Sequence, residues 1–204
     1  MRLMVRIALV LFAGLLALSD PAHAAQTGSP NRVTAPQAAQ NGKQPAQAYF
    51  TDVELVSHHG ETMRLYTDLL QGKVVVINSF FTTCTGSCPI IMSTMARIQE
   101  ALGDRVGKEV SLISLTVDPV TDTPPRLKEY AERLGARPGW HLVGGKKENV
   151  VLALRKLGQA VKEKEQHLNI IIIGNERTRL WKKVMALAPT ETLITIVEGV
   201  LQDK

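Results

Sequence analysis

An unbroken apolar run, Val74 to Ile77, lies inside a predicted strand that spans Lys73 to Phe80. A strand of this kind has no face that suits water, so we expect other elements to cover both of its faces. Further strands are predicted at Val110–Val117, Trp140–Val143 and Asn169–Ile173. Strands buried on both faces are typical of α/β proteins with parallel sheets.

Helical segments alternate with these strands. Three segments between strands have apolar residues at helical spacing, and a fourth follows Thr190, which we expect to cap the last helix. A hairpin with its turn at Gly60 is predicted before the buried strands, and a second, with its turn at Gly174-Asn175, is predicted after them. This order predicts an α/β fold of the thioredoxin-like type, with a central mixed sheet flanked by helices and an N-terminal β-hairpin.

The first 48 residues have a different character. Arg2 and Arg6 precede a short apolar stretch, Ile7 to Leu18, which ends at Ala22-His23-Ala24, so residues 1–24 are predicted to be a signal peptide. The stretch is too short for a comfortable membrane span, and an uncleaved N-terminal tether is the alternative. Residues 25–48 are rich in Ala, Gln and Pro and are predicted to be a flexible leader. The folded domain is predicted to be 49–204, exported to the periplasm or an equivalent compartment.

The charge pattern excludes one class of partner. The chain has 24 basic and 19 acidic residues, a formal net charge of +5, and only 4% aromatic residues. The basic residues are scattered along the sequence, and aromatic residues are too few for a platform on which bases stack. We therefore expect no binding to nucleic acid, and contact with a membrane only by proximity or through an uncleaved tether.

The only two cysteines, Cys84 and Cys88, directly follow the first buried strand, and Pro89 marks the start of the next helix. A bridge across so short a loop gains little stability, so the pair is predicted to be functional. We expect Cys84 to be the more exposed and the helix N-terminus to lower the pKa of Cys88. The pair has two uses, reversible disulfide formation or binding of a soft metal. The sequence from Thr85 to Cys88 also fits the Thr-x-x-Cys pattern of thiol peroxidases, but Phe81 stands where those proteins have Pro.

A third ligand favours the metal. His167 precedes the strand of isoleucines, and in a thioredoxin-like sheet that entry loop lies beside the cysteine loop. Two thiolates and one imidazole suit copper, whereas structural zinc usually has four ligands. His58 and His59 lie at a predicted turn, where solvent exposure and auxiliary metal contact are the alternatives, and His141 is predicted to be structural. Metal binding needs reduced thiols, so copper loading and the disulfide exclude each other.

A second polar motif, Val117-Asp118-Pro119-Val120-Thr121-Asp122-Thr123-Pro124, follows the next buried strand. Ligand sites in open α/β sheets favour the carboxyl ends of strands. Asp118 is therefore expected to lie near the cysteine loop and to support the site, while Asp122 is expected to stabilise the turn and the start of the following helix.

These motifs resemble the SCO/SenC family. The resemblance rests on the segment from Phe81 to Pro89, on the Asp118 motif and on His167, and it covers most of 49–204. It implies a thioredoxin-like copper protein, exported or membrane-tethered, that helps to assemble the copper centre of cytochrome c oxidase. It also implies that Cys84, Cys88 and His167 bind the copper.

The same resemblance implies the partners. These are an apo-protein that accepts copper, such as a subunit of cytochrome c oxidase, and a thiol reductant. The alternative to a copper-assembly protein is a thiol–disulfide oxidoreductase that uses Cys84 and Cys88 to reduce cysteines of a copper-site apo-protein. The chain departs from the family where Gln166 replaces an Asp common before the His, and where Gly174-Asn175 replaces a common Asp-containing turn. These departures concern the surface that meets a partner and remove no ligand.

Overall fold

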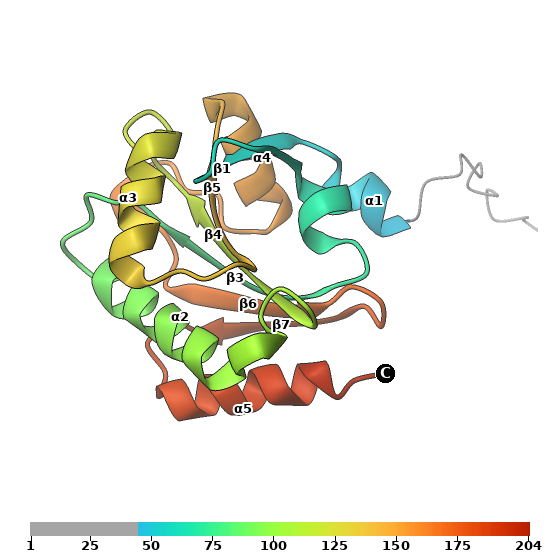
Figure 1. Ribbon diagram of the computed structural model, residues 1–204. Helices are drawn as coiled ribbons and strands as arrows, with labels where there is room; N and C mark the ends of the chain where they lie inside the picture. Colours follow the sequence, from blue (N-terminus) through green and yellow to red (C-terminus); the bar gives the residue numbers. More distant parts are fainter. Residues whose placement is uncertain (1–44) are drawn as a thin grey trace, which may run out of the picture. The chain divides into compact units, whose positions relative to one another are not determined.

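The computed structural model describes residues 45–204, which form a seven-stranded mixed sheet with helices on both faces (Figure 1). The strand order is β2-β1-β5-β4-β3-β6-β7. The strands are β1 (Glu54–Ser57), β2 (Thr62–Arg64), β3 (Val74–Phe80), β4 (Val110–Thr116), β5 (Trp140–Gly144), β6 (Ile170–Asn175) and β7 (Leu180–Met185). The helices are α1 (Pro45–Phe50), α2 (Cys88–Leu102), α3 (Pro124–Leu134), α4 (Lys147–Lys156) and α5 (Thr190–Leu201). Shorter helical turns are η1 (Leu65–Leu70), η2 (Gly103–Arg105) and η3 (Lys164–Gln166).

The strand directions confirm the predicted fold class. The neighbours β3, β4 and β5 run parallel, whereas β6 pairs antiparallel with β3, and β7 pairs antiparallel with β6. The N-terminal hairpin of β1 and β2 adds the other antiparallel edge, and Gly60 lies in its turn with a φ of 85°. Because β3 and β4 are parallel neighbours, the loops that follow them, which carry the cysteines and the Asp118 motif, leave the same edge of the sheet.

Strand β3 is buried along its whole length, as the apolar run predicts. Val74, Val76 and Phe80 face a core built with α2, α3 and α5, and Val75 and Ile77 face a second core built with η1 and α4. Figure 1 shows α2 and α5 on one side of the sheet and α4 with the η1 turn on the other. Removal of this apolar surface from water supplies the main stabilisation of the domain. The loops at the sheet edge are therefore held by a rigid scaffold and can carry functional residues.

Two local predictions near the C-terminus are wrong. Gly174 and Asn175 belong to β6, and the turn lies at 176–179 instead. Gly174 is needed because the ring of Trp181 lies against it, and a Cβ added there would stand 2.2 Å from Trp181 Cε3. Thr190 is the first residue of α5 rather than its cap, and its hydroxyl accepts a hydrogen bond from Arg97.

At the other end of the chain, α1 begins at Pro45, four residues before the predicted start of the folded domain. The predicted signal peptide and most of the predicted leader lie outside the described residues. Within the described part, no helix has the length and apolar character needed to cross a membrane.

Candidate metal centre

Cys84, Cys88 and His167 come together at the edge of the sheet although 79 residues separate the last two. His167 Nε2 lies 3.2 Å from Cys88 Sγ and 4.0 Å from Cys84 Sγ. The three potential ligand atoms lie within 4.8 Å of one another, and they form the one such group of His, Cys, Asp or Glu residues within 45–204. The structure therefore brings together the three residues that the sequence singled out.

The two thiols differ in exposure as the sequence predicts. Cys84 lies partly exposed in the loop after β3, whereas Cys88 is the first residue of α2 and is 0% exposed. The prediction for the pKa of Cys88 is wrong. Burial, followed by the adjacent Cys84 thiol, raises the pKa of Cys88 to about 12. Desolvation of the thiolate outweighs the partial charge of the helix N-terminus, so Cys88 is a neutral thiol in the free protein.

His167 is held between the thiols and an aromatic ring. Its side chain is buried, and the ring of Phe81 meets it edge-on with ring centroids 5.6 Å apart. Burial lowers the pKa of His167, so the imidazole is neutral near pH 7 and can offer a nitrogen lone pair. Nε2 faces the sulfurs, while Nδ1 is buried without a hydrogen-bond partner among the described residues. This arrangement suits ligation through Nε2.

The carboxylate of Asp122 anchors the cysteine loop. Asp122 is 1% exposed, and it accepts hydrogen bonds from both the backbone N–H and the hydroxyl of Thr82, two residues before Cys84. It also accepts a hydrogen bond from the hydroxyl of Thr116 at the end of β4 (2.5 Å). Sequence reasoning assigned Asp122 to its own turn and helix, and so missed this role.

Asp118 acts on the other ligand-bearing loop. Its carboxylate accepts a hydrogen bond from Lys164 Nζ at 2.7 Å, three residues before His167. The same ammonium group lies 5.3 Å from the centre of the Phe81 ring. Burial opposes ionisation of Asp118, but the hydrogen bond from Lys164 holds the pKa of Asp118 below its ordinary value. Lys164 belongs to a run of alternating charges, and nothing in that run distinguishes it before the loops are brought together.

The thiol of Cys84 lines a pocket of about 360 Å³. Cys84, His167, Phe81 and Glu165 are among the residues that line it, whereas Cys88 lies beneath. A visiting side chain or ion therefore meets Cys84 and His167 first. Two sulfurs and one imidazole in this position can bind a soft metal ion, and two free thiols this close can also form a disulfide.

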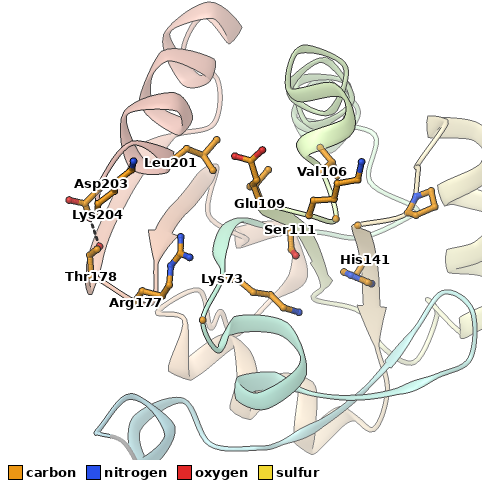
Figure 2. Close-up of a pocket in the computed structure, with 16 residues that line it drawn as sticks. Lys73, Val106, Glu109, Ser111, His141, Arg177, Thr178, Leu201, Asp203 and Lys204 are labelled. Carbon is orange, nitrogen blue, oxygen red and sulfur yellow. Dashed lines mark hydrogen bonds between the residues drawn. The ribbon is translucent and has the colours of Figure 1, made fainter.

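The other described histidines lie away from this centre. His58 is 6% exposed, and its Nδ1 accepts a hydrogen bond from the Leu142 N–H, so the expectation of solvent exposure is wrong for this residue. His59 beside it is exposed. His141 lines a cavity of about 1010 Å³ at the opposite edge of the sheet, where β3 and β4 begin. Figure 2 shows its imidazole at this cavity together with Lys73 and Arg177.

Comparison with known proteins identifies related chains. The family model described as SCO1/SenC matches residues 40–202. The SCO2-like protein RC0895 of Rickettsia conorii is 35% identical over 79 residues, which cover 39% of this chain and 37% of that protein. The chain thus covers well under two thirds of the length of this curated relative.

Solved structures share the fold. Yeast Sco1 with copper bound has a TM-score of 0.61 at 22% identity, covering 74% of this chain and 92% of that one. BsSco, described as a member of the Sco family of cytochrome c oxidase assembly proteins with a disulfide switch, has a TM-score of 0.61 at 23% identity over 74% of this chain and 92% of its own. At these identities the likeness establishes the thioredoxin-like fold.

Proposed function

Since the chain belongs to the SCO1/SenC family, we propose that it is a copper metallochaperone. Its copper ion is bound by Cys84, Cys88 and His167. The observation that carries the proposal is the cluster of two sulfurs and one imidazole nitrogen within 4.8 Å of one another. Soft sulfur ligands favour Cu(I), and the nitrogen ligand makes Cu(II) acceptable as well. Zinc fits less well, because a structural zinc site would need a fourth ligand.

Loading requires the reduced protein. Both thiols are free, and each must lose its proton to bind the ion. Because burial raises the pKa of Cys88, the bound cation has to displace a proton from this thiol. Proton release therefore accompanies copper uptake, and oxidation of the pair to a disulfide blocks it. His167 is already neutral and contributes Nε2 without losing a proton.

The proposed acceptor is an apo-protein with a copper centre, such as a subunit of cytochrome c oxidase. Support comes from the description of BsSco as belonging to a family of cytochrome c oxidase assembly proteins. Export to the periplasm or an equivalent compartment is part of the proposal, and its support is the basic and apolar sequence of residues 1–24. Asp118 is proposed as the supporting residue, acting on the His167 loop through Lys164.

An anaerobic copper titration of the reduced protein tests the ligand set. We expect one copper per chain, and with Cu(II) a sulfur-to-copper charge-transfer band. Cys84→Ser, Cys88→Ser and His167→Ala should each weaken binding by at least about tenfold, which is about 1.4 kcal/mol. His59→Ala, which changes an exposed histidine outside the cluster, is the matched control. Unchanged copper affinity in His167→Ala refutes the assignment of this residue.

A second function, reduction of disulfides in the apo-protein acceptor, is favoured by the closeness of the two free thiols, whose sulfurs lie within 4.8 Å of each other and one of which is partly exposed. Cys84 would attack first, because Cys88 is buried. The dithiol would become a disulfide, and its two electrons would reduce the cysteines of the acceptor. Incubation of the metal-free dithiol with an oxidised acceptor peptide tests this function. Failure to reduce that peptide, with copper binding intact, refutes this second function.

A further inference from the structure

A third pocket, of about 410 Å³, lies between α1, the end of α4 and strands β6 and β7. It is separate from the metal centre. Gly174, on which the Trp181 ring rests, pairs with Val75 near the start of β3, whereas the cysteine loop follows the end of that strand. The volume lies within the range of pockets that bind small molecules, about 300–1,000 Å³.

The interior of this pocket is apolar and partly aromatic. Phe50 and Trp181 form one wall with their ring centroids 5.3 Å apart, and Leu157 and Ile172 contribute aliphatic surface. Trp181 is only half-buried, so part of this surface remains open to water. Such a surface favours an apolar ligand, because its burial removes both partners from water.

The rim of the pocket carries positive charge. Lys156, Arg179 and Lys183 line it, and no Asp or Glu does. None of these three forms an ion pair with a carboxylate of residues 45–204. The Lys156 ammonium lies 5.2 Å from the centre of the Tyr49 ring, and Lys183 Nζ reaches over Gly158 at the end of α4. Three cations around an apolar opening repel one another, and an anion would relieve this repulsion.

We propose that this pocket binds a free single-chain carboxylate of the fatty-acid type. The chain packs against Phe50, Trp181 and Ile172, and the carboxylate lies among the three cations. Charge complementarity selects this occupant. The chain's own residues 25–44 contain Arg32 and Lys43 and no acidic residue, so this segment does not complement a basic rim. A neutral amphiphile would leave the cations unpaired.

Tryptophan fluorescence of the full chain offers a direct test. The chain has two tryptophans, and Trp140 is 1% exposed in the core, so Trp181 reports on the pocket. A brominated medium-chain carboxylate should quench this signal saturably, and unlabelled decanoate should compete. Decanol should bind about tenfold more weakly than decanoate, corresponding to about 1.4 kcal/mol. Equal competition by the alcohol and the carboxylate overturns the proposal.

Charge variants locate the site. Lys156→Gln and Lys183→Gln should each weaken decanoate binding about threefold to tenfold. Lys182→Gln is the matched control, because this neighbouring exposed lysine on β7 does not line the pocket, and it should bind like the wild type. Urea unfolding midpoints confirm that each variant is folded. An equal effect of Lys182→Gln and Lys183→Gln overturns the site.

A parallel experiment with vesicles distinguishes binding of a free carboxylate from binding to an anionic membrane surface. Binding to anionic phospholipid vesicles without binding to free decanoate would make the basic rim a membrane contact, and would overturn the proposal. Calorimetry with Trp181→Phe should still detect decanoate while the quenching signal falls, since phenylalanine keeps an apolar wall. If the wild type binds neither the brominated carboxylate nor decanoate, the proposal is also overturned.

Discussion

Replacement of Asp122 by alanine should both destabilise the fold and loosen the metal centre. The carboxylate is 1% exposed and accepts hydrogen bonds from three donors: the Thr82 N–H, the Thr82 hydroxyl and the Thr116 hydroxyl. Asp122→Ala removes the acceptor for all three. The hydroxyl groups can turn toward other acceptors, but the direction of the partly buried Thr82 N–H is set by the backbone.

The expected loss follows from these contacts. A hydrogen bond to a charged acceptor contributes about 1.5–3 kcal/mol, and a buried donor left unpaired costs about 1–3 kcal/mol. Relief of the cost of burying a carboxylate offsets part of this loss. We therefore expect Asp122→Ala to lower the free energy of unfolding by about 3–4 kcal/mol, a large share of the 5–15 kcal/mol of a typical domain. Asp122→Asn keeps one acceptor and should lose about half as much.

Urea unfolding followed by circular dichroism measures this loss. The exposed Asp104→Ala is the matched control and should change stability by less than about 0.5 kcal/mol. A double-mutant cycle with Thr82→Ala should give a coupling energy of about 1–3 kcal/mol. Copper affinity of the folded Asp122→Asn variant should fall, because Thr82 sets the position of Cys84. A loss below about 1 kcal/mol in Asp122→Ala, or coupling near zero, would refute the reasoning.

Three further perturbations probe other contacts. Gly174→Ala should cost about 1–3 kcal/mol, because the new Cβ would lie 2.2 Å from Trp181 Cε3. In a Trp181→Ala background, where the ring is gone, Gly174→Ala should instead raise the free energy of unfolding by about 0.5–1 kcal/mol. If Gly174→Ala shifts the urea midpoint in the same direction in both backgrounds, the clash with Trp181 is ruled out. Burial, and then a nearby lysine, lowers the pKa of His141 from 6.5 to about 4, so its contribution to stability is complete above pH 6.5 and is lost as the pH falls toward 4. His141→Gln should flatten this fall between pH 7 and 5 in unfolding experiments, whereas a slope that changes only in His59→Gln would contradict the assignment. Lys164→Gln should weaken copper binding several-fold in chelator competition while stability changes by less than about 1 kcal/mol, and unchanged affinity would remove the ion pair from any supporting role.

The fold was largely predictable because its strongest signal is burial. The run from Val74 to Ile77 predicts a strand covered on both faces, and β3 is buried at every position. The failure at Gly174-Asn175 has a physical cause. Glycine next to asparagine is typical of a turn, but here the glycine makes room for the Trp181 ring on the neighbouring strand. A contact across strands thus overrides the local preference.

The members of the candidate site were also predictable, but their energetics were not. Topology alone brings the loop before β6 beside the loop after β3, which is why His167 could be linked to Cys84 and Cys88. The pKa of Cys88 depends on the competition between helix and burial, and only the packing around α2 decides it. The role of Asp122 likewise depends on a hydrogen bond to a segment 40 residues away.

The short turn between Asp118 and Asp122 has a consequence for local unfolding. Its backbone is closed by hydrogen bonds from the Thr121 and Asp122 N–H groups to the Asp118 carbonyl, and its two carboxylates hold the cysteine loop and the histidine loop. Both loops therefore lose their anchors when this one turn opens. They should behave as a single cooperative unit, with amide hydrogens that exchange at a common opening free energy below that of global unfolding.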